Sequence, residues 1–234
     1  MLKYILTGTC NITNFMSIIS FIEKILDYIY YRKCYICGKK CSDISLCLEC
    51  KEALFSDLKF HKAEKFNTKI YSATAYENNF LKIIRALKYH QKKEFKNIIS
   101  EILIKLVEHY NLNINDYIVC PVPIHKNRLK HRKYNHMELV AQEFANHFSL
   151  KMDNSLLSRT KDTPPLYKLS IPQRREYING AFMASENIAN KKIILLDDIV
   201  TSGTTIAELS KLILEQKPKD FIVLCASRSN NCNF

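Results

Sequence analysis

One stretch near the C-terminus, IILLDDIVTSGTT at Ile193–Thr205, constrains the fold more than any other part of the chain. Its first four residues are apolar without interruption and predict a buried strand, and two aspartates follow directly. A loop rich in hydroxyl groups comes next, and the periodic apolar segment behind it predicts a helix. A strand, a loop and a helix in this order are typical of α/β proteins that bind a ligand beyond the carboxyl ends of parallel strands.

The residues of this loop indicate a phosphate site. Gly203 lets the backbone approach a ligand closely, and the amide N–H groups at a helix start point at a bound anion. The adjacent carboxylates of Asp197 and Asp198 suit the 2′- and 3′-hydroxyls of a ribose whose 5′-phosphate lies in the loop. Further hydroxyl donors come from Thr201, Ser202, Thr204 and Thr205. The alternative to a phosphate site is a helix-capping cluster of Ser and Thr beside two solvated aspartates. Other phosphate-binding motifs, GxGxxG and GxxxxGK[ST], are excluded because the four glycines of the chain cannot form them.

Strands and helices alternate over the rest of the C-terminal two thirds. The apolar patterns predict strands at Ile70–Tyr76, Tyr117–Pro121 and Phe221–Ala226, and helices at Leu81–Tyr89, Phe95–Tyr110, Met137–Phe148 and Thr204–Gln216. Lys161–Pro172 has no apolar period and is predicted to be a loop. Alternation of this kind predicts an α/β fold with a parallel sheet flanked by helices on both faces.

The nine cysteines of the chain favour a metal over a disulfide framework. Cys34, Cys37, Cys47 and Cys50 form two CxxC pairs separated by nine residues. Four thiolates at this spacing predict a closed tetrahedral structural zinc site, with no open position for catalysis. Cys41, which lies between the two pairs, is able to replace one of the four ligands, although the CxxC spacing favours Cys34, Cys37, Cys47 and Cys50.

Three regions follow from these patterns. Residues 1–33 contain an amphipathic helix at Phe15–Tyr31, whose charged face argues against a membrane span. We expect this helix to pack on the protein, with a membrane-surface helix as the alternative, and we expect a cytoplasmic protein. Residues 34–66 form the expected zinc-binding module, and Lys51–Lys69 is predicted as a short helix and a polar connection. Residues 67–234 form the larger domain.

Several motifs together resemble one family. IILLDDIVTSGTT is similar to the fingerprint of type I phosphoribosyltransferases, and the wider chain resembles the ComF/GntX branch, the competence-protein relatives. The branch's VPxH…R…RGFNQ segment is matched at Val122–His125, Arg128 and Arg132–His136, with Lys133 and His136 in place of glycine and glutamine. Its LKY motif and its RT-x-TPP…LS…R…N-x-x-GAF segment are matched at Leu87–Tyr89 and from Arg159 to Phe182.

The resemblance implies a ligand and a set of contacts. Asp197 and Asp198 would hold the ribose of phosphoribosyl pyrophosphate or a related nucleotide, and Thr201–Thr205 would hold its 5′-phosphate. The pyrophosphate, bound through Mg²⁺, would face Arg128, Lys130 and Arg132, which are otherwise a solvated basic face. Lys161–Gln173 would close over the substrate. No catalytic residue is identified, and the acceptor of any transferred phosphoribose stays open.

The net charge of +12 calls for anionic partners and leaves two functions open. One is a ComF-like phosphoribosyltransferase-domain protein linked to competence and DNA uptake, with single-stranded DNA and uptake or processing proteins as expected partners. The alternative is a non-catalytic, zinc-dependent single-stranded DNA-binding accessory protein with a relic transferase pocket. Basic segments at Arg85–Lys96 and His125–His136 keep contact with nucleic acid open.

Overall fold

The computed structural model describes residues 32–41, 45–164 and 169–229. Contacts divide the chain into two compact units between Lys51 and Glu52, which are described separately. The expected N-terminal helix at Phe15–Tyr31 lies outside the described residues. Within those residues, no helix has the length and apolar character needed to cross a membrane.

The smaller unit is built around a short hairpin. Strands β1 (Arg32–Lys33) and β2 (Lys40–Cys41) pair in antiparallel fashion, and helix α2 (Leu48–Ser56) begins after Cys47. The turn between the strands is closed by the amide of Gly38, which donates to the carbonyl of Cys34 at 2.9 Å. Gly38 has a φ of +76°, a left-handed conformation that favours glycine. This turn positions the first CxxC pair.

A six-stranded sheet forms the centre of the larger unit, in the order β3-β4-β10-β9-β5-β6. All neighbours are parallel except β3, which pairs antiparallel with β4. The predicted α/β fold with a parallel sheet is thereby confirmed, and the antiparallel edge strand β3 was not predicted. The strands are β3 (His61–Lys65), β4 (Thr68–Ala75), β5 (Tyr117–Pro121), β6 (Lys151–Met152), β9 (Lys192–Val200) and β10 (Asp220–Arg228).

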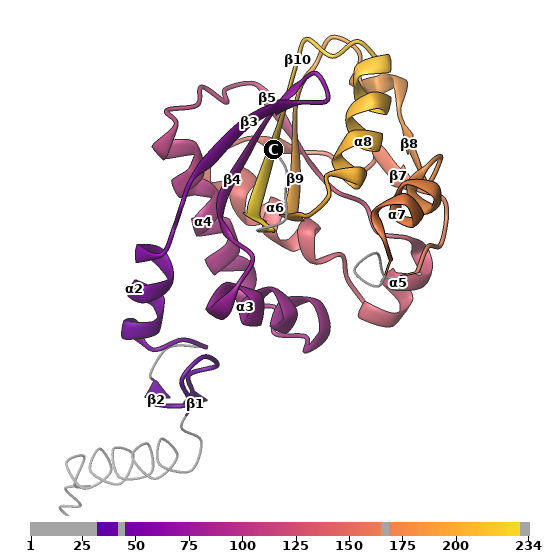
Figure 1. The fold of residues 1–234 in the computed structure, drawn as a ribbon. Helices are drawn as coiled ribbons and strands as arrows, with labels where there is room; N and C mark the ends of the chain where they lie inside the picture. Colours follow the sequence, from indigo (N-terminus) through magenta and orange to yellow (C-terminus); the bar gives the residue numbers. More distant parts are fainter. Residues whose placement is uncertain (1–31, 42–44, 165–168, 230–234) are drawn as a thin grey trace, which may run out of the picture. The chain divides into compact units, whose positions relative to one another are not determined.

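Helices cover both faces of this sheet (Figure 1). On one face α8 (Thr204–Glu215) buries Ile206, Leu209 and Ile213 against Ile193 and Leu195 of β9. The other face is covered by α3 (Asn78–Tyr89), α4 (Phe95–His109) and α6 (His136–His147), whose apolar sides are almost completely buried. Burial of these faces supplies the main stabilising term of the fold.

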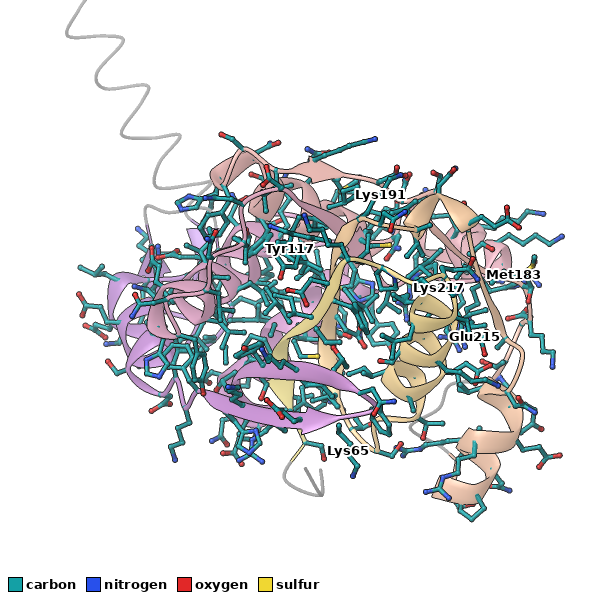
Figure 2. All side chains as sticks on the ribbon, turned by 90° about the horizontal axis from the view of Figure 1, so that it is seen from above. Lys65, Tyr117, Met183, Lys191, Glu215 and Lys217 are labelled. Carbon is teal, nitrogen blue, oxygen red and sulfur yellow. The ribbon has the colours of Figure 1, made fainter. Side chains whose placement is uncertain are left out.

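Smaller elements lie outside the six-stranded sheet. They are helix α5 (Lys126–Arg132), the antiparallel pair β7 (Leu157–Arg159) and β8 (Phe182–Ala184), helix α7 (Ile171–Ile178) and the 3₁₀ turn η2 (Glu186–Ile188). Figure 2 looks onto the amino edge of the sheet, where Tyr117 begins β5 and where Lys191 and Lys217 shortly precede β9 and β10. The helix starts and loops of the predicted site therefore lie at the other end of the sheet.

Two local predictions differ from the structure. The polar connection expected before residue 69 contains β3, which pairs with β4 and belongs to the larger unit, N-terminal to the predicted boundary near residue 66. The loop expected at Lys161–Pro172 ends at Ser170, because α7 begins at Ile171. Both elements are polar at their surface, so neither has a strong apolar period.

Candidate functional site

The two aspartates lie inside β9 and not after it. The strand was predicted to end at Leu196, but its pairing with β10 continues to Val200, while its pairing with β5 ends at the partners Pro121 and Leu196. Successive side chains of a strand point to opposite faces. Asp197 therefore shares the face of Ile193 and Leu195, and Asp198 lies on the face covered by α3, α4 and α6.

Asp198 is buried between two nitrogen groups from distant elements. Its Oδ2 atom forms an ion pair with the ammonium of Lys88 at the end of α3, and the Nε2 atom of His136 lies 3.6 Å from the same oxygen. All three side chains are at most 16% exposed. Burial alone would raise the pKa of Asp198, but the charge of Lys88 and the contact with His136 lower it well below its usual range.

Asp197 has the opposite electrostatic character. Burial, followed by the neighbouring Asp198 carboxylate, raises the pKa of Asp197 well above its usual value. The Oδ1 atom of Asp197 accepts the backbone N–H of Asp198 at 2.9 Å. On this face lies Arg159, whose pKa is lowered to about 10, first by burial and then by Arg128. Two adjacent carboxylates thus differ in charge preference, which suits a site where hydroxyl groups both donate and accept.

The predicted phosphate loop follows β9 directly. Gly203 has a φ of +73° and occupies the N-cap of α8, so the first amides of this helix open onto the loop. The hydroxyls of Ser202 and Thr204 lie 2.8 Å apart. The guanidinium of Arg174 in α7 donates to the hydroxyl of Thr201 at 3.4 Å. Thr205 lies in the first turn of α8. The loop therefore combines the backbone N–H groups of a helix start, several hydroxyl groups and one nearby cation.

The three basic residues predicted on the pyrophosphate side lie on α5, and the structure does not group them as one set. The guanidinium of Arg128 donates to the carbonyls of Thr163 (2.8 Å) and Pro164 (3.1 Å). Arg132 lies over the ring of Tyr89, 4.9 Å from its centroid, and Lys130 is exposed. Arg128 thereby holds the start of the segment predicted to close over a substrate.

Further contacts fasten α5 to the same segment. Asn127 donates to a carboxylate oxygen of Asp162 at 2.6 Å, and His125 Nδ1 lies 3.4 Å from the other. Lys133 ends α5 with a φ of +67°. The related family has glycine there, and the left-handed backbone explains why glycine suits the position. Asn135 caps α6 and also donates to the carbonyl of Val122 at 3.2 Å, which ties α6 to the end of β5.

Sequence reasoning assigned no role to three residues of this site: Lys88, Arg159 and Arg174. All three fall within motifs that resemble the ComF/GntX branch, so the motifs were the available signal. The contacts of Lys88 with Asp198 and of Arg174 with Thr201 depend on tertiary structure, and so does the charge interaction of Arg159 with Asp197. No spacing in the sequence brings these residues together.

The four predicted metal cysteines form one cluster in the smaller unit. The Sγ atoms of Cys34, Cys37, Cys47 and Cys50 all lie within 4.8 Å of one another, with Cys37 and Cys47 3.7 Å apart. Tetrahedral zinc with sulfur ligands at about 2.3 Å needs sulfur separations near ~3.8 Å, so the set fits a metal ion. Burial opposes ionisation of Cys34, but backbone N–H groups of Cys37, Cys47 and Ile36 lower its pKa to about 6, which favours a thiolate ligand. Cys41 lies apart, with its thiol 3.7 Å from the carbonyl of Arg32.

Comparison with known proteins finds one family model and several distantly similar structures. Residues 138–232 match the phosphoribosyl transferase domain family. Among solved structures, a hypoxanthine phosphoribosyltransferase from Staphylococcus aureus is 17% identical with a TM-score of 0.34, covering 57% of this chain and 63% of that one. The glutamine phosphoribosylpyrophosphate amidotransferase of Bacillus subtilis is 13% identical with a TM-score of 0.38, covering 56% of this chain and 25% of that one. The family match and the sheet define a protein with a phosphoribosyltransferase domain.

The curated relatives narrow this class. The DNA utilization protein YhgH of Escherichia coli K12 is 27% identical over 151 residues, which are 63% of this chain and 66% of YhgH. Competence protein F of Haemophilus influenzae is 30% identical over 98 residues, covering 41% of this chain and 43% of that protein. The chain thus spans just under two thirds of the length of the Escherichia coli protein. It is a ComF-like phosphoribosyltransferase-domain protein.

Proposed function

We propose that the chain binds phosphoribosyl pyrophosphate together with Mg²⁺ at the carboxyl end of β9. The observation that carries the proposal is the sequence of Asp197, Asp198 and the Gly203 loop along one continuous strand, loop and helix start. Asp197 and Asp198 are assigned to the ribose and Thr201–Thr205 to the 5′-phosphate. Arg159 and Arg174 supply positive charge near the same ligand, and Lys130 is the exposed member of the proposed pyrophosphate set.

Transfer of phosphoribose is the reaction that such a site supports. Displacement of pyrophosphate at the anomeric carbon passes through a cation-like sugar, so the protein mainly positions groups and stabilises charge. Mg²⁺ bound with the pyrophosphate would neutralise the leaving group. The site residues then hold the ribose and its 5′-phosphate in place during the displacement.

The test is calorimetry of the full chain with Mg²⁺ and phosphoribosyl pyrophosphate. Replacing both Asp197 and Asp198 by Asn should weaken binding at least ~100-fold, because each lost charge-assisted hydrogen bond costs roughly 1.5–3 kcal/mol. Asp116→Asn is the matched control, since this aspartate is exposed and lies at the opposite edge of the sheet, beside Lys192. Equal affinity in the wild type and the double variant would refute the site. An assay of pyrophosphate release with nucleobases, amines or single-stranded DNA as acceptors then distinguishes an active transferase from a protein that only binds the ligand.

We propose zinc as the metal of the cysteine cluster, in a structural role. The fit of the four Sγ atoms to a tetrahedron supports this assignment, and a fully ligated ion leaves no position for substrate water. The proposal includes a cytoplasmic location, where thiols stay reduced and available to a metal.

A role with single-stranded DNA is the second candidate, and one specific observation favours it. The two basic segments identified in the sequence are joined in space, because Arg132 lies over Tyr89 and Lys93 lies over Tyr134 at 5.0 Å from the ring centroid. Two relatives are named for DNA utilization and competence. Anisotropy with an oligothymidine should show binding that falls steeply with salt and weakens in Lys130→Glu. Lys217→Glu, at the opposite edge, is the control, and salt-insensitive binding would exclude this surface.

A further inference from the structure

Two residues at the end of α3, on either side of Lys88, contact the same distant segment. The carbonyl of Leu87 accepts the hydroxyl of Tyr134 at 2.6 Å, and the ring of Tyr89 lies under the guanidinium of Arg132. Between them, Lys88 reaches Asp198, which also faces His136. The end of α3 is thus fixed to residues 132–136 on both sides of Lys88, and the ammonium of Lys88 has a defined position.

The surroundings of Asp198 make the position of Lys88 important. The Asp198 side chain is 5% exposed, and no other ammonium or guanidinium forms an ion pair with it among the described residues. Both ring nitrogens of His136 are buried without a hydrogen-bond partner in the described structure, although Nε2 faces the carboxylate. A buried carboxylate that loses its cation becomes an uncompensated charge. Lys88 therefore determines whether Asp198 stays ionised and where its oxygens point.

We infer that Lys88 is a positioning residue for the ribose site, acting through Asp198. With His136 on the other side, it holds the Asp198 carboxylate as a preformed acceptor before the sugar arrives. The inference rests on the proposed function, because it assigns the ribose hydroxyls to this carboxylate. A preformed acceptor removes the cost of ordering the side chain on binding.

Two other roles for Lys88 make different predictions. A direct contact with the pyrophosphate would affect every ligand that contains pyrophosphate. A purely structural role would lower thermal stability and weaken all ligands together. Positioning of Asp198 affects the sugar alone. Three probes separate these roles: phosphoribosyl pyrophosphate, ribose 5-phosphate and inorganic pyrophosphate, each with Mg²⁺.

The experiment is calorimetry of the full chain with these probes. Lys88→Met should weaken phosphoribosyl pyrophosphate and ribose 5-phosphate by about 10- to 100-fold and change pyrophosphate affinity by less than about twofold. Lys82→Met is the control, because Lys82 is exposed on the same helix. Unchanged sugar binding in Lys88→Met would overturn the inference, and so would an equal loss for ribose 5-phosphate and pyrophosphate.

A double-mutant comparison keeps the test decisive where Lys88→Met folds poorly. Lys88→Met combined with Asp198→Asn removes both charges of the buried pair. If Lys88 acts only through Asp198, the double variant binds ribose 5-phosphate as Asp198→Asn does, and additive losses would refute the inference. Wild-type protein that binds none of the sugar probes would refute the proposed function and this inference with it, whereas additive losses in a wild type that binds would refute the inference alone.

Discussion

Single residues set the charge of the site at the carboxyl end of β9. Asp197 and Asp198 are neighbours in sequence, yet the ammonium of Lys88 faces Asp198, whereas burial is the main influence on the pKa of Asp197. The pKa of the two carboxyls is therefore displaced in opposite directions. Two adjacent residues of one strand thus provide a charged hydrogen-bond acceptor and a carboxyl group that holds a proton more readily.

His136 should make folding stability depend on pH. Burial lowers its pKa to about 4, against the opposing contact with Asp198, whereas an unfolded histidine titrates near ~6.5. Between these values the unfolded chain binds the extra proton, so stability is complete above the unfolded pKa and falls as pH drops toward 4. A full shift of this size corresponds to roughly 3 kcal/mol.

Urea unfolding at pH 7 and pH 4.5 measures this loss. His136→Gln cannot titrate, so it should lose about 2 kcal/mol less than the wild type over this range. Asp197 works in the opposite direction, since its raised pKa favours the folded state at low pH, but it is present in both proteins. The exposed His131→Gln serves as control and should follow the wild type. Parallel curves for all three proteins would contradict the assignment.

At the scale of elements, the start of α7 connects the predicted closing segment to the phosphate loop. The Gln173 side chain accepts the backbone N–H of Ser170 at 2.9 Å and its hydroxyl at 3.0 Å, which caps the helix. Arg174 then donates to the carbonyl of Leu169 at 3.0 Å and reaches Thr201. The helix start thus fixes the Arg174 guanidinium beside the loop, whereas the neighbouring Arg175 is exposed.

Replacement of Arg174 should therefore weaken phosphate binding selectively. We expect Arg174→Ala to lower the affinity for phosphoribosyl pyrophosphate by about tenfold or more, because a charged hydrogen bond of roughly 1.5–3 kcal/mol is lost. Arg175→Ala removes the same charge from the same helix and should change affinity by less than about twofold. Isothermal calorimetry of both variants gives the comparison. Similar losses in the two would show that only overall charge matters.

The elements predicted from the sequence are those with a strong apolar period. Helices α3 and α4 and strand β5 have apolar faces whose spacing indicates their type and nearly their bounds. The strands β6, β7 and β8 are two or three residues long and too short for any period. Aspartates are disfavoured in strands, so β9 was predicted to stop before Asp197, but pairing with β10 overrides that preference.

The residues of the candidate site also differ in how far the sequence alone could identify them. Asp197, Asp198 and the Gly203 loop are contiguous in sequence, and their order alone indicates what kind of ligand they suit. Lys88 and Arg174 reach them only through the packing of α3 and α7, which depends on the whole fold. Contiguous parts of the site were accessible to sequence reasoning, and parts contributed by distant elements were not.

At the scale of the whole molecule, the chain divides into two compact units between Lys51 and Glu52, and the cysteine cluster belongs to the smaller one. A segment of this size buries too little apolar surface to be stable alone, so a metal would supply much of its folding energy. The larger unit has its own sheet and core. Loss of the metal should therefore unfold one unit and leave ligand binding in the other.

Cys47→Ser separates the two units in one experiment. Elemental analysis should find about one zinc per wild-type chain and in Cys41→Ser, whose thiol lies outside the cluster, but little in Cys47→Ser. Hydrogen exchange should become fast in residues 32–51 of Cys47→Ser, because three thiolates no longer close the tetrahedron. Calorimetry of the same variant should give wild-type affinity for phosphoribosyl pyrophosphate, since every residue assigned to the ligand lies after residue 51. Loss of that affinity together with the zinc would show that the smaller unit contributes to the site, and an unchanged exchange pattern would contradict the structural role of the metal.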